Sequence, residues 1–269
     1  QLFMPFANVW KCFQGKAISN SAERKRMIRS KYISPNSNQS IIIFVDGPTN
    51  DEINHYNNVE IIQGYTFNPT LFRQLKVANY FEHCEELVTL CGDLPISLEV
   101  IADDKEGMVR QAKKLSLLGN TVSVKIPVIF TSGESTKEVI EELSKEGIKL
   151  NITAVFSKDQ VQEFLPVMSG TNSIISVFSG RLFDIGQNAV EVTGEIADYI
   201  HENSKCRVLW ASPRMVYDLL GACEAKCDII TMPSPLVKKI PLIGKSSREY
   251  SLDTVKMFYN DAVASKYTL

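Results

Sequence analysis

The chain has 269 residues, of which 44% are hydrophobic and 22% are charged, and its formal net charge is -2. These values are ordinary for a globular protein and give no general case for nucleic acid or a membrane surface as a partner. The six cysteines form no CxxC pair and the three histidines are scattered. We therefore expect buried thiols in a reducing compartment and no metal site.

Residues 1–40 differ from the rest of the chain in charge. They hold seven basic residues and one acid, whereas the other 229 residues hold 22 basic and 30 acidic groups. An aromatic-rich start is followed by a stretch typical of a short basic helix and then by a polar linker. We interpret residues 1–40 as a basic N-terminal extension packed on the outside of the main body. The alternative is an arm that binds a partner.

From residue 41 onwards, short β-rich runs alternate with runs of helical spacing. The β-rich runs are Ile41–Val45, Val59–Thr66, Ile96–Ile101, Thr121–Val128, Lys149–Val155, Ser173–Phe178, Cys206–Ala211 and Asp228–Met232. Helical spacing occurs in residues 70–82, 104–118, 134–146, 157–168, 187–203 and 213–225, and again near the C-terminus in roughly 252–265. Eight units at roughly 29 residues each are typical of an eightfold α/β barrel. No glycine-rich phosphate motif follows any strand, so a nucleotide-binding fold has no support. We predict a single (β/α)8 TIM barrel over residues 41–269.

Lys125 stands among apolar and β-branched neighbours in the fourth β-rich run, Thr121–Val128. An ammonium inside a buried strand is costly unless something uses or neutralises it. One interpretation is a lysine that reaches solvent or pairs with a carboxylate. The other is an amine whose pKa burial has lowered, which makes it a nucleophile for carbonyl carbons.

Polar side chains gather where the predicted strands end, and barrel enzymes carry their chemistry at those ends. The residues at or just beyond the strand ends are Asp46, Asn68, Glu99, Lys125, Asn151, Thr153, Ser176, Phe178, Arg181, Ser212 and Arg214. Turn chemistry or strand propensity explains each of them singly. Together they form a convergent polar set around one lysine.

This set permits a coherent reaction. A neutral lysine attacks a ketone, and the resulting iminium ion lets a neighbouring carbon–carbon bond break or form. Asp46 and Glu99 can supply the proton transfers, directly or through a water that Thr153 positions. A phosphate monoester could be held by Arg181, Ser212 and Arg214.

Six motifs occur along residues 41–269 in a characteristic order and spacing. They are GYTFNPTL (64–71), SVKIPV (123–128), NITAVFS (151–157), SVFSGR (176–181), WASPR (210–214) and CDIITMP (227–233). Together they resemble the transaldolase family of class I, Schiff-base aldolase barrels. The resemblance implies Lys125 as the Schiff-base lysine and Asp46 as an acid/base that also touches the substrate hydroxyls. It implies that Glu99 and Thr153 hold the catalytic water.

The resemblance also implies substrate contacts. The dihydroxyacetone portion would be bound by Thr66, Asn68 and Ser176, with Asn151 counted among the substrate-binding residues, and the phosphate by Arg181, Ser212 and Arg214. Phe178 and Glu99 favour dihydroxyacetone transfer, because the related fructose-6-phosphate aldolases carry Tyr and Gln there. Phe67 and Pro213 depart from the usual family pattern and bear on the choice of substrate.

The resemblance further implies a cytoplasmic enzyme of carbohydrate metabolism, in the pentose phosphate pathway, that uses sugar phosphates and needs no cofactor. We also expect a homo-oligomer. Two alternatives remain open. One is simple aldol cleavage or formation of the fructose-6-phosphate aldolase type, and the other is a non-catalytic barrel that serves as a binding module.

Overall fold

The computed structural model describes residues 41–168 and 170–268 of the chain. The expectations for residues 1–40 lie outside these described residues. The chain divides into two compact units, one of which ends at Lys238 and contains the barrel. Residues 239–268 fall in the other unit, although the domain boundary drawn from the sequence placed them with the barrel.

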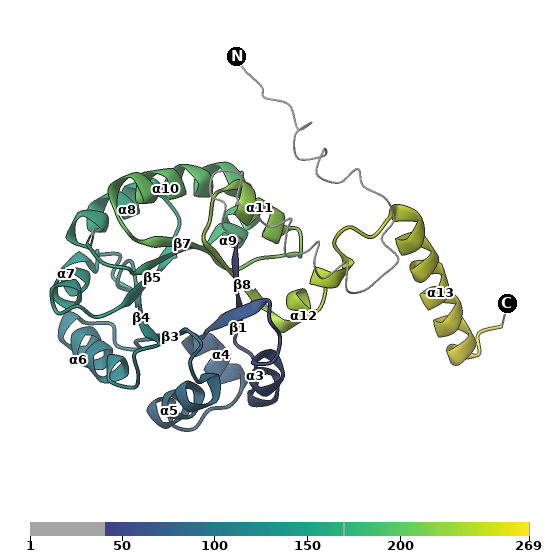
Figure 1. Cartoon of the computed structure of the whole chain (residues 1–269), viewed down its shortest axis with the longest axis horizontal. Coiled ribbons are helices and arrows are strands. Elements are labelled where there is room, and N and C mark those ends of the chain that lie inside the picture. Colours follow the sequence, from purple (N-terminus) through teal and green to yellow (C-terminus); the bar gives the residue numbers. More distant parts are fainter. Residues whose placement is uncertain (1–40, 169, 269) are drawn as a thin grey trace, which may run out of the picture. The chain divides into compact units, whose positions relative to one another are not determined.

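Eight parallel strands close into a barrel in the order in which they occur in the chain (Figure 1). The strands are β1 (Ile42–Asp46), β2 (Ile62–Thr66), β3 (Ile96–Glu99), β4 (Val122–Pro127), β5 (Leu150–Val155), β6 (Ile174–Val177), β7 (Arg207–Trp210) and β8 (Ile229–Pro233). β8 pairs with β1 along the whole of that strand and closes the barrel. The predicted (β/α)8 TIM barrel is confirmed, and each predicted β-rich run overlaps one of these strands.

Helices surround the strands of the barrel unit (Figure 1). They are α3 (Asn50–Tyr56), α4 (Pro69–Gln74), α5 (Tyr80–Cys91), α6 (Lys105–Ser116), α7 (Lys137–Lys145), α8 (Lys158–Phe164), η1 (Leu165–Val167), α9 (Ser179–Asp184), α10 (Ala189–Asn203), α11 (Asp218–Glu224) and α12 (Ser234–Val237). Met108, Ala112 and Leu115 of α6 are buried at helical spacing, which is the pattern that fixes an amphipathic helix to a core.

One predicted helical run, residues 70–82, is two helices in the structure. Asn68 caps α4, and Pro69 is its first residue. Lys76 has a φ of +56°, in the left-handed region that interrupts a helix. Asn79 then caps α5, which continues to Cys91. The prediction of a single helix ending at residue 82 was therefore wrong.

Helix α3 was not predicted, because the Gly-Pro pair before it indicates a turn. Its start is fixed by a capping box. The Thr49 hydroxyl accepts from the backbone N–H of Glu52, and the Glu52 carboxylate accepts from the backbone N–H of Thr49. Such a box supplies two partners that the first turn of a helix otherwise lacks.

The described part of the second unit contains η2 (Ile240–Leu242) and α13 (Ser247–Ser265). A capping box of Ser246 and Glu249 begins α13, five residues before the predicted start of the last helix. None of the described helices is long and apolar enough to cross a membrane.

The barrel interior is filled in layers, since alternate residues of each strand face inward. An apolar layer includes Phe44, Ile174, Leu209 and Ile229. A Cβ on Gly64 would lie 2.5 Å from the ring of Phe44, so the ring fills the space that glycine leaves. Two residues further along the strands, the next inward layer lies at their C-terminal ends and is mostly polar.

Candidate active site

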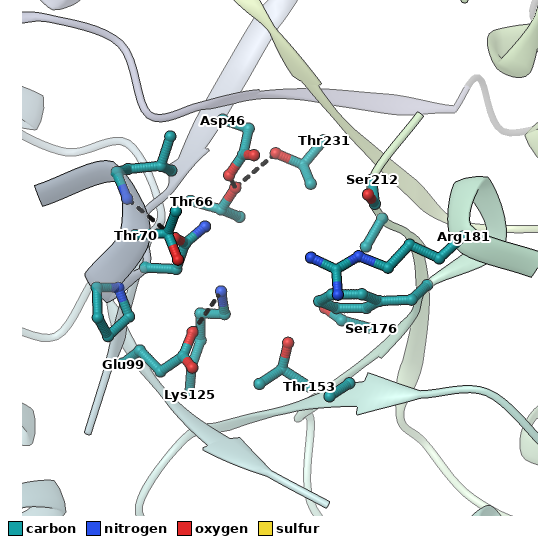
Figure 2. A pocket seen from close by; sticks show the side chains of 16 residues that line it. Asp46, Thr66, Thr70, Glu99, Lys125, Thr153, Ser176, Arg181, Ser212 and Thr231 are labelled. Atoms are coloured by element: carbon teal, nitrogen blue, oxygen red, sulfur yellow. Dashed lines mark hydrogen bonds and ion pairs between the residues drawn. The ribbon is translucent and has the colours of Figure 1, made fainter. Parts of the chain in front are cut away.

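A cavity of about 390 Å³ lies at the C-terminal ends of the strands (Figure 2). All eight strands, or the segments directly after them, contribute side chains to its wall. Ten of the twelve site residues expected from the sequence line it, namely Asp46, Thr66, Asn68, Glu99, Lys125, Thr153, Ser176, Phe178, Arg181 and Ser212. The fold therefore brings together residues that are up to 166 positions apart in the chain.

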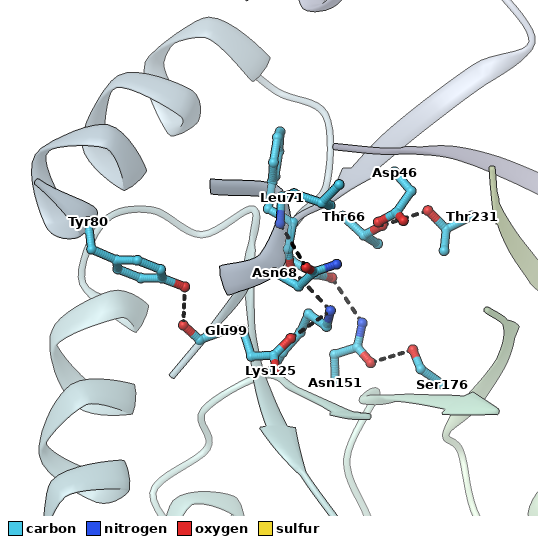
Figure 3. A network of polar contacts seen from close by, with 12 residues as sticks. Asp46, Thr66, Asn68, Leu71, Tyr80, Glu99, Lys125, Asn151, Ser176 and Thr231 are labelled. Atoms are coloured by element: carbon cyan, nitrogen blue, oxygen red, sulfur yellow. Dashed lines mark hydrogen bonds and ion pairs between the residues drawn. The ribbon is translucent and has the colours of Figure 1, made fainter. Parts of the chain in front are cut away.

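Lys125 projects from β4 into the cavity, and its side chain is only 7% exposed. Its Nζ lies 2.9 Å from Oε2 of Glu99, which stands opposite it on β3, and donates to the backbone oxygen of Phe67 at 3.1 Å (Figure 3). A buried ion pair requires such close and complete partners, because both charges have lost their water. The pair lines the cavity, so the amine remains within reach of a ligand.

Asp46 ends β1 and lies in the same cavity wall. Its Oδ1 accepts from the hydroxyl of Thr66 at 2.7 Å, and Oγ1 of Thr66 lies 2.6 Å from Oγ1 of Thr231 (Figure 3). Burial raises the pKa of Asp46, and the nearby charge of Lys125 and the Thr66 hydrogen bond only partly offset that rise. A buried carboxyl group with a raised pKa in a cavity is a candidate for proton transfer.

Helix α4 and Tyr80 fix the positions of two further cavity residues. The Asn68 side chain caps α4 by accepting from the backbone N–H of Leu71 at 3.2 Å, and it also lines the cavity (Figure 3). The Tyr80 hydroxyl donates to the backbone oxygen of Glu99. The Tyr80 contact connects α5 to the backbone at the end of β3, where Glu99 carries the carboxylate that pairs with the lysine.

Thr153 and Ser176 come from β5 and β6. The Thr153 hydroxyl is buried and has no hydrogen-bond partner among the described residues, so an oxygen or donor inside the cavity would complete it. Ala154, directly after it, has a φ of +59°, a strained conformation for a residue with a side chain. The Ser176 hydroxyl donates to the Asn151 side chain at 2.6 Å (Figure 3).

Arg181 supplies positive charge on the side of the cavity opposite the lysine (Figure 2). Its guanidinium carbon lies 5.2 Å from the centre of the Phe178 ring, within the range of a cation–π contact. Within the described residues, no carboxylate forms an ion pair with this guanidinium. The Phe178 ring is itself packed on Phe156, with 5.7 Å between the ring centres.

Ser212 and Gly180 join the segments that follow β7 and β6. The backbone N–H of Gly180 donates to the oxygen of Ala211 at 3.2 Å. A Cβ on Gly180 would lie 1.6 Å from the backbone oxygen of Ser212, so no other residue fits there. Ser212 has a φ of +58°, and this turn directs its segment toward the cavity and Arg181.

The family model for Transaldolase/Fructose-6-phosphate aldolase matches residues 43–268, which is most of the chain. The chain belongs to this family. Membership supports an aldolase-type function for the barrel.

Relatives in this family include a "probable transaldolase" of Methanococcus maripaludis, 34% identical over 201 residues that cover 73% of this chain and 88% of that protein. A "probable transaldolase" of Clostridium botulinum is 36% identical and covers 72% of this chain and 86% of its own length. Among solved structures, N-acetylneuraminate lyase from Mycoplasma synoviae is similar, with a TM-score of 0.50 at 15% identity. The match covers 80% of this chain and 73% of the lyase chain. This likeness concerns the fold alone.

Two residues expected in the substrate site of a transaldolase or fructose-6-phosphate aldolase do not line the cavity. Asn151 is fully buried beneath it, where its side chain donates to Ser97 at 3.1 Å and accepts from Ser176. Arg214 instead forms a two-point ion pair with Asp184, the last residue of α9. Both residues contact side chains or segments that do line the cavity, so the structure gives them supporting positions.

Sequence reasoning about the family motifs missed Thr231 of β8, which lines the cavity. The sequence did hold a signal for it. β8 is otherwise apolar before its proline, and Thr231 lies two residues after the inward-facing Ile229. The alternation of inward and outward residues therefore placed this hydroxyl in the polar layer.

Proposed function

We propose that this chain transfers a dihydroxyacetone unit from a ketose phosphate to an aldose phosphate through a Schiff base on Lys125. The single observation that supports this most is the Lys125–Glu99 pair inside the cavity, with Asp46 in the same wall. The carboxylate beside the ammonium can accept its proton, which leaves a neutral amine facing a bound carbonyl.

The proposed sequence of steps starts when the Lys125 nitrogen adds to the ketose carbonyl carbon. The resulting oxygen takes up the proton that Glu99 received from Lys125, passed on through a water in the cavity. One proton of the nitrogen then passes to this hydroxyl, which leaves as water and gives an iminium ion. Asp46 then removes the proton of the C4 hydroxyl, the C3–C4 bond breaks, and its electron pair is taken up by the iminium as an enamine. The aldose leaves, the enamine adds to the carbonyl carbon of the acceptor aldose, and the new alkoxide oxygen takes the proton back from Asp46. Hydrolysis of the new iminium releases the product ketose and returns the amine.

Thr153 and Glu99 would hold the water that enters and leaves in these steps. The unpartnered Thr153 hydroxyl supports this role, because a water in the cavity would satisfy it. Thr66, Asn68 and Ser176 would bind the dihydroxyacetone hydroxyls.

The phosphate end of the substrate would bind at Arg181 and Ser212. A guanidinium with no paired carboxylate among the described residues is a suitable partner for a phosphate dianion. The Phe178 ring beneath this guanidinium restricts its orientation. Arg214 would contribute only after leaving Asp184.

The cellular setting is part of the same proposal. Ketose and aldose phosphates as substrates correspond to the pentose phosphate pathway. Cys84, Cys91, Cys206, Cys223 and Cys227 are free thiols, in accord with a reducing, cytoplasmic location. We also propose a homo-oligomer.

Product analysis with and without an acceptor tests the proposed reaction. Fructose 6-phosphate would be supplied as donor, with or without erythrose 4-phosphate as acceptor. Transfer predicts a seven-carbon ketose phosphate with the acceptor and little free dihydroxyacetone without it. Free dihydroxyacetone at the same rate in both reactions would instead favour aldol cleavage, and no product in either would contradict the proposed donor.

A further inference from the structure

The hydroxyl of Thr66 lies between two other oxygen-bearing side chains. It donates to Oδ1 of Asp46 at 2.7 Å, and its oxygen lies 2.6 Å from Oγ1 of Thr231. Thr66 is 2% exposed and Thr231 is 4% exposed, so little solvent competes for these contacts. The three groups come from β2, β1 and β8 and lie side by side where the barrel closes (Figure 3).

The number of protons determines the direction of both hydrogen bonds. A threonine hydroxyl carries one proton, and it can also accept. An ionised Asp46 can only accept, so it takes the proton of Thr66. The short contact between the two threonines must then be made by the proton of Thr231. When Asp46 is protonated and donates to Thr66, both bonds can reverse.

We propose that Thr231 is a positioning residue that holds the Thr66 hydroxyl as a donor to Asp46 and thereby sets how readily Asp46 gains and loses its proton. This inference rests on the acid/base role of Asp46 in the proposed function. Hydrogen bonds in a chain polarise one another, so a donor to the Thr66 oxygen strengthens the bond that Thr66 gives to the carboxylate. A stronger bond to the carboxylate favours its charged form.

Other groups also act on Asp46. Lys125 on β4 favours the carboxylate, whereas burial and the charge of Glu99 on β3 oppose it. Arg181 lines the same cavity after β6. A change at Thr231 leaves all of these in place, so its effect on the titration of Asp46 can be attributed to the threonine chain.

The test compares four enzymes over a pH series: wild type, Thr231→Val, Thr231→Ser and Thr231→Ala. Val keeps the shape and removes the hydroxyl. The Ser and Ala variants form a matched pair, since both lack the methyl group and only Ser keeps the hydroxyl. If the Val variant does not fold, this pair shows whether the hydroxyl of residue 231 acts on Asp46. The measurements are kcat and KM for the donor ketose phosphate, and kcat/KM as a function of pH.

We expect the acidic limb of the kcat/KM profile to move upward by about 0.5–1 pH unit in the Val and Ala variants. Below the midpoint, kcat/KM should fall about threefold to tenfold, with the loss mainly in kcat. The Ser variant should keep the wild-type midpoint and most of the rate. If Val or Ala keeps the wild-type midpoint, the inference is wrong. A rise in KM alone would also overturn it, since Thr231 would then contact the substrate directly.

Borohydride trapping of the donor on each variant separates this inference from the proposed function. An adduct on Lys125 in every variant, together with unmoved pH profiles, contradicts only the role of Thr231. If the wild-type enzyme itself forms no adduct, the Schiff-base chemistry fails and the inference fails with it.

Discussion

Phe178 is the residue that most directly bears on the kind of aldol chemistry. It lines the cavity, follows β6, and lies beneath the guanidinium of Arg181. A phenyl ring offers no proton donor, so water near it must be held by other groups, such as Glu99 and Thr153. Under the proposed function, this absence favours transfer to an acceptor sugar over release of dihydroxyacetone.

Phe178→Tyr is expected to shift the product balance toward aldol cleavage. The new hydroxyl would lie in the cavity wall. There it can hold a water near the enamine or protonate the enamine, and either would speed hydrolysis of the enamine. The measurement is the ratio of free dihydroxyacetone to transfer product with a fixed acceptor concentration. Phe156→Tyr, on the ring that packs behind Phe178, is the matched control and should leave the ratio close to that of wild type.

The site residues could be predicted to different degrees. Lys125 was predictable because a single charge in an apolar strand is conspicuous, and Asp46 and Glu99 because they end strands. Whether Lys125 was paired, solvated or facing a cavity could not be predicted, since that depends on the register of β3 against β4. The positions of Asn151 and Arg214 also depend on tertiary contacts, with Ser97, Ser176 and Asp184, that leave no trace in local sequence.

The segments after β6 and β7 form the proposed phosphate end of the site. They meet where Gly180 allows the backbone of Ser212 to approach, and the Asp184–Arg214 ion pair connects them further out. The Asp218 carboxylate, almost fully buried, accepts from the backbone N–H groups of Arg214 and Met215 and holds the second segment in place.

Gly180→Ala should destabilise the protein and weaken phosphate binding. The added Cβ would meet backbone atoms, which cannot move aside as a flexible side chain can, and overpacking of this kind costs about 1–3 kcal/mol. Thermal or urea unfolding measures the loss. Gly194→Ala in α10 is the control, because its Cβ would have only an ordinary contact at 3.8 Å. A Gly180→Ala variant as stable as wild type would show that Ser212 does not lie as close as described.

Asp184→Asn should strengthen binding of a phosphorylated ketose. The Asp184–Arg214 pair is about half exposed, so its contribution is small, and its removal frees a guanidinium close to Ser212. The expected fall in KM is up to about fivefold for the phosphorylated sugar. The unphosphorylated ketose serves as the control and should show little change. An equal change for both sugars would mean that Arg214 does not act on the phosphate.

Most elements were predictable from the hydrophobic period, and each of the two exceptions has its own physical cause. The break between α4 and α5 depends on a non-glycine residue, Lys76, in the left-handed region, which sequence pattern does not favour. Helix α3 is short and begins with a cap after a turn motif, so its period is too brief to detect.

At the scale of the whole molecule, barrel closure depends on contacts around β8. Asp228, just before β8, accepts from the backbone N–H of Val208 and from the ring of His201, and its backbone oxygen accepts from Ile42. One residue thus connects β7, β1 and α10 at the end of the barrel opposite the cavity.

Stability should fall as pH rises through the titration of His201. The hydrogen bond with Asp228 is the largest effect on the pKa of His201 and raises it. The charges of Asp228 and Asp198 also raise this pKa, whereas burial and the charge of Lys226 lower it. Because the pKa is raised in the folded state, the His201–Asp228 pair contributes fully to the free energy of unfolding below about pH 6.5, the pKa of an unfolded histidine. This contribution is lost as the pH rises above the folded-state pKa. His201→Gln should therefore reduce the drop in Tm between pH 6 and pH 8.5. An identical drop in both proteins would exclude this role.

The most direct test of the Schiff-base mechanism is reduction with borohydride in the presence of fructose 6-phosphate, followed by peptide mass spectrometry. Formation of a Schiff base predicts a stable dihydroxyacetone or ketose adduct on the peptide that contains Lys125. No adduct is expected in Lys125→Met, whose side chain is unbranched and only one atom shorter but has no amine. An adduct on another lysine, or turnover by Lys125→Met, would contradict catalysis through a Schiff base on Lys125.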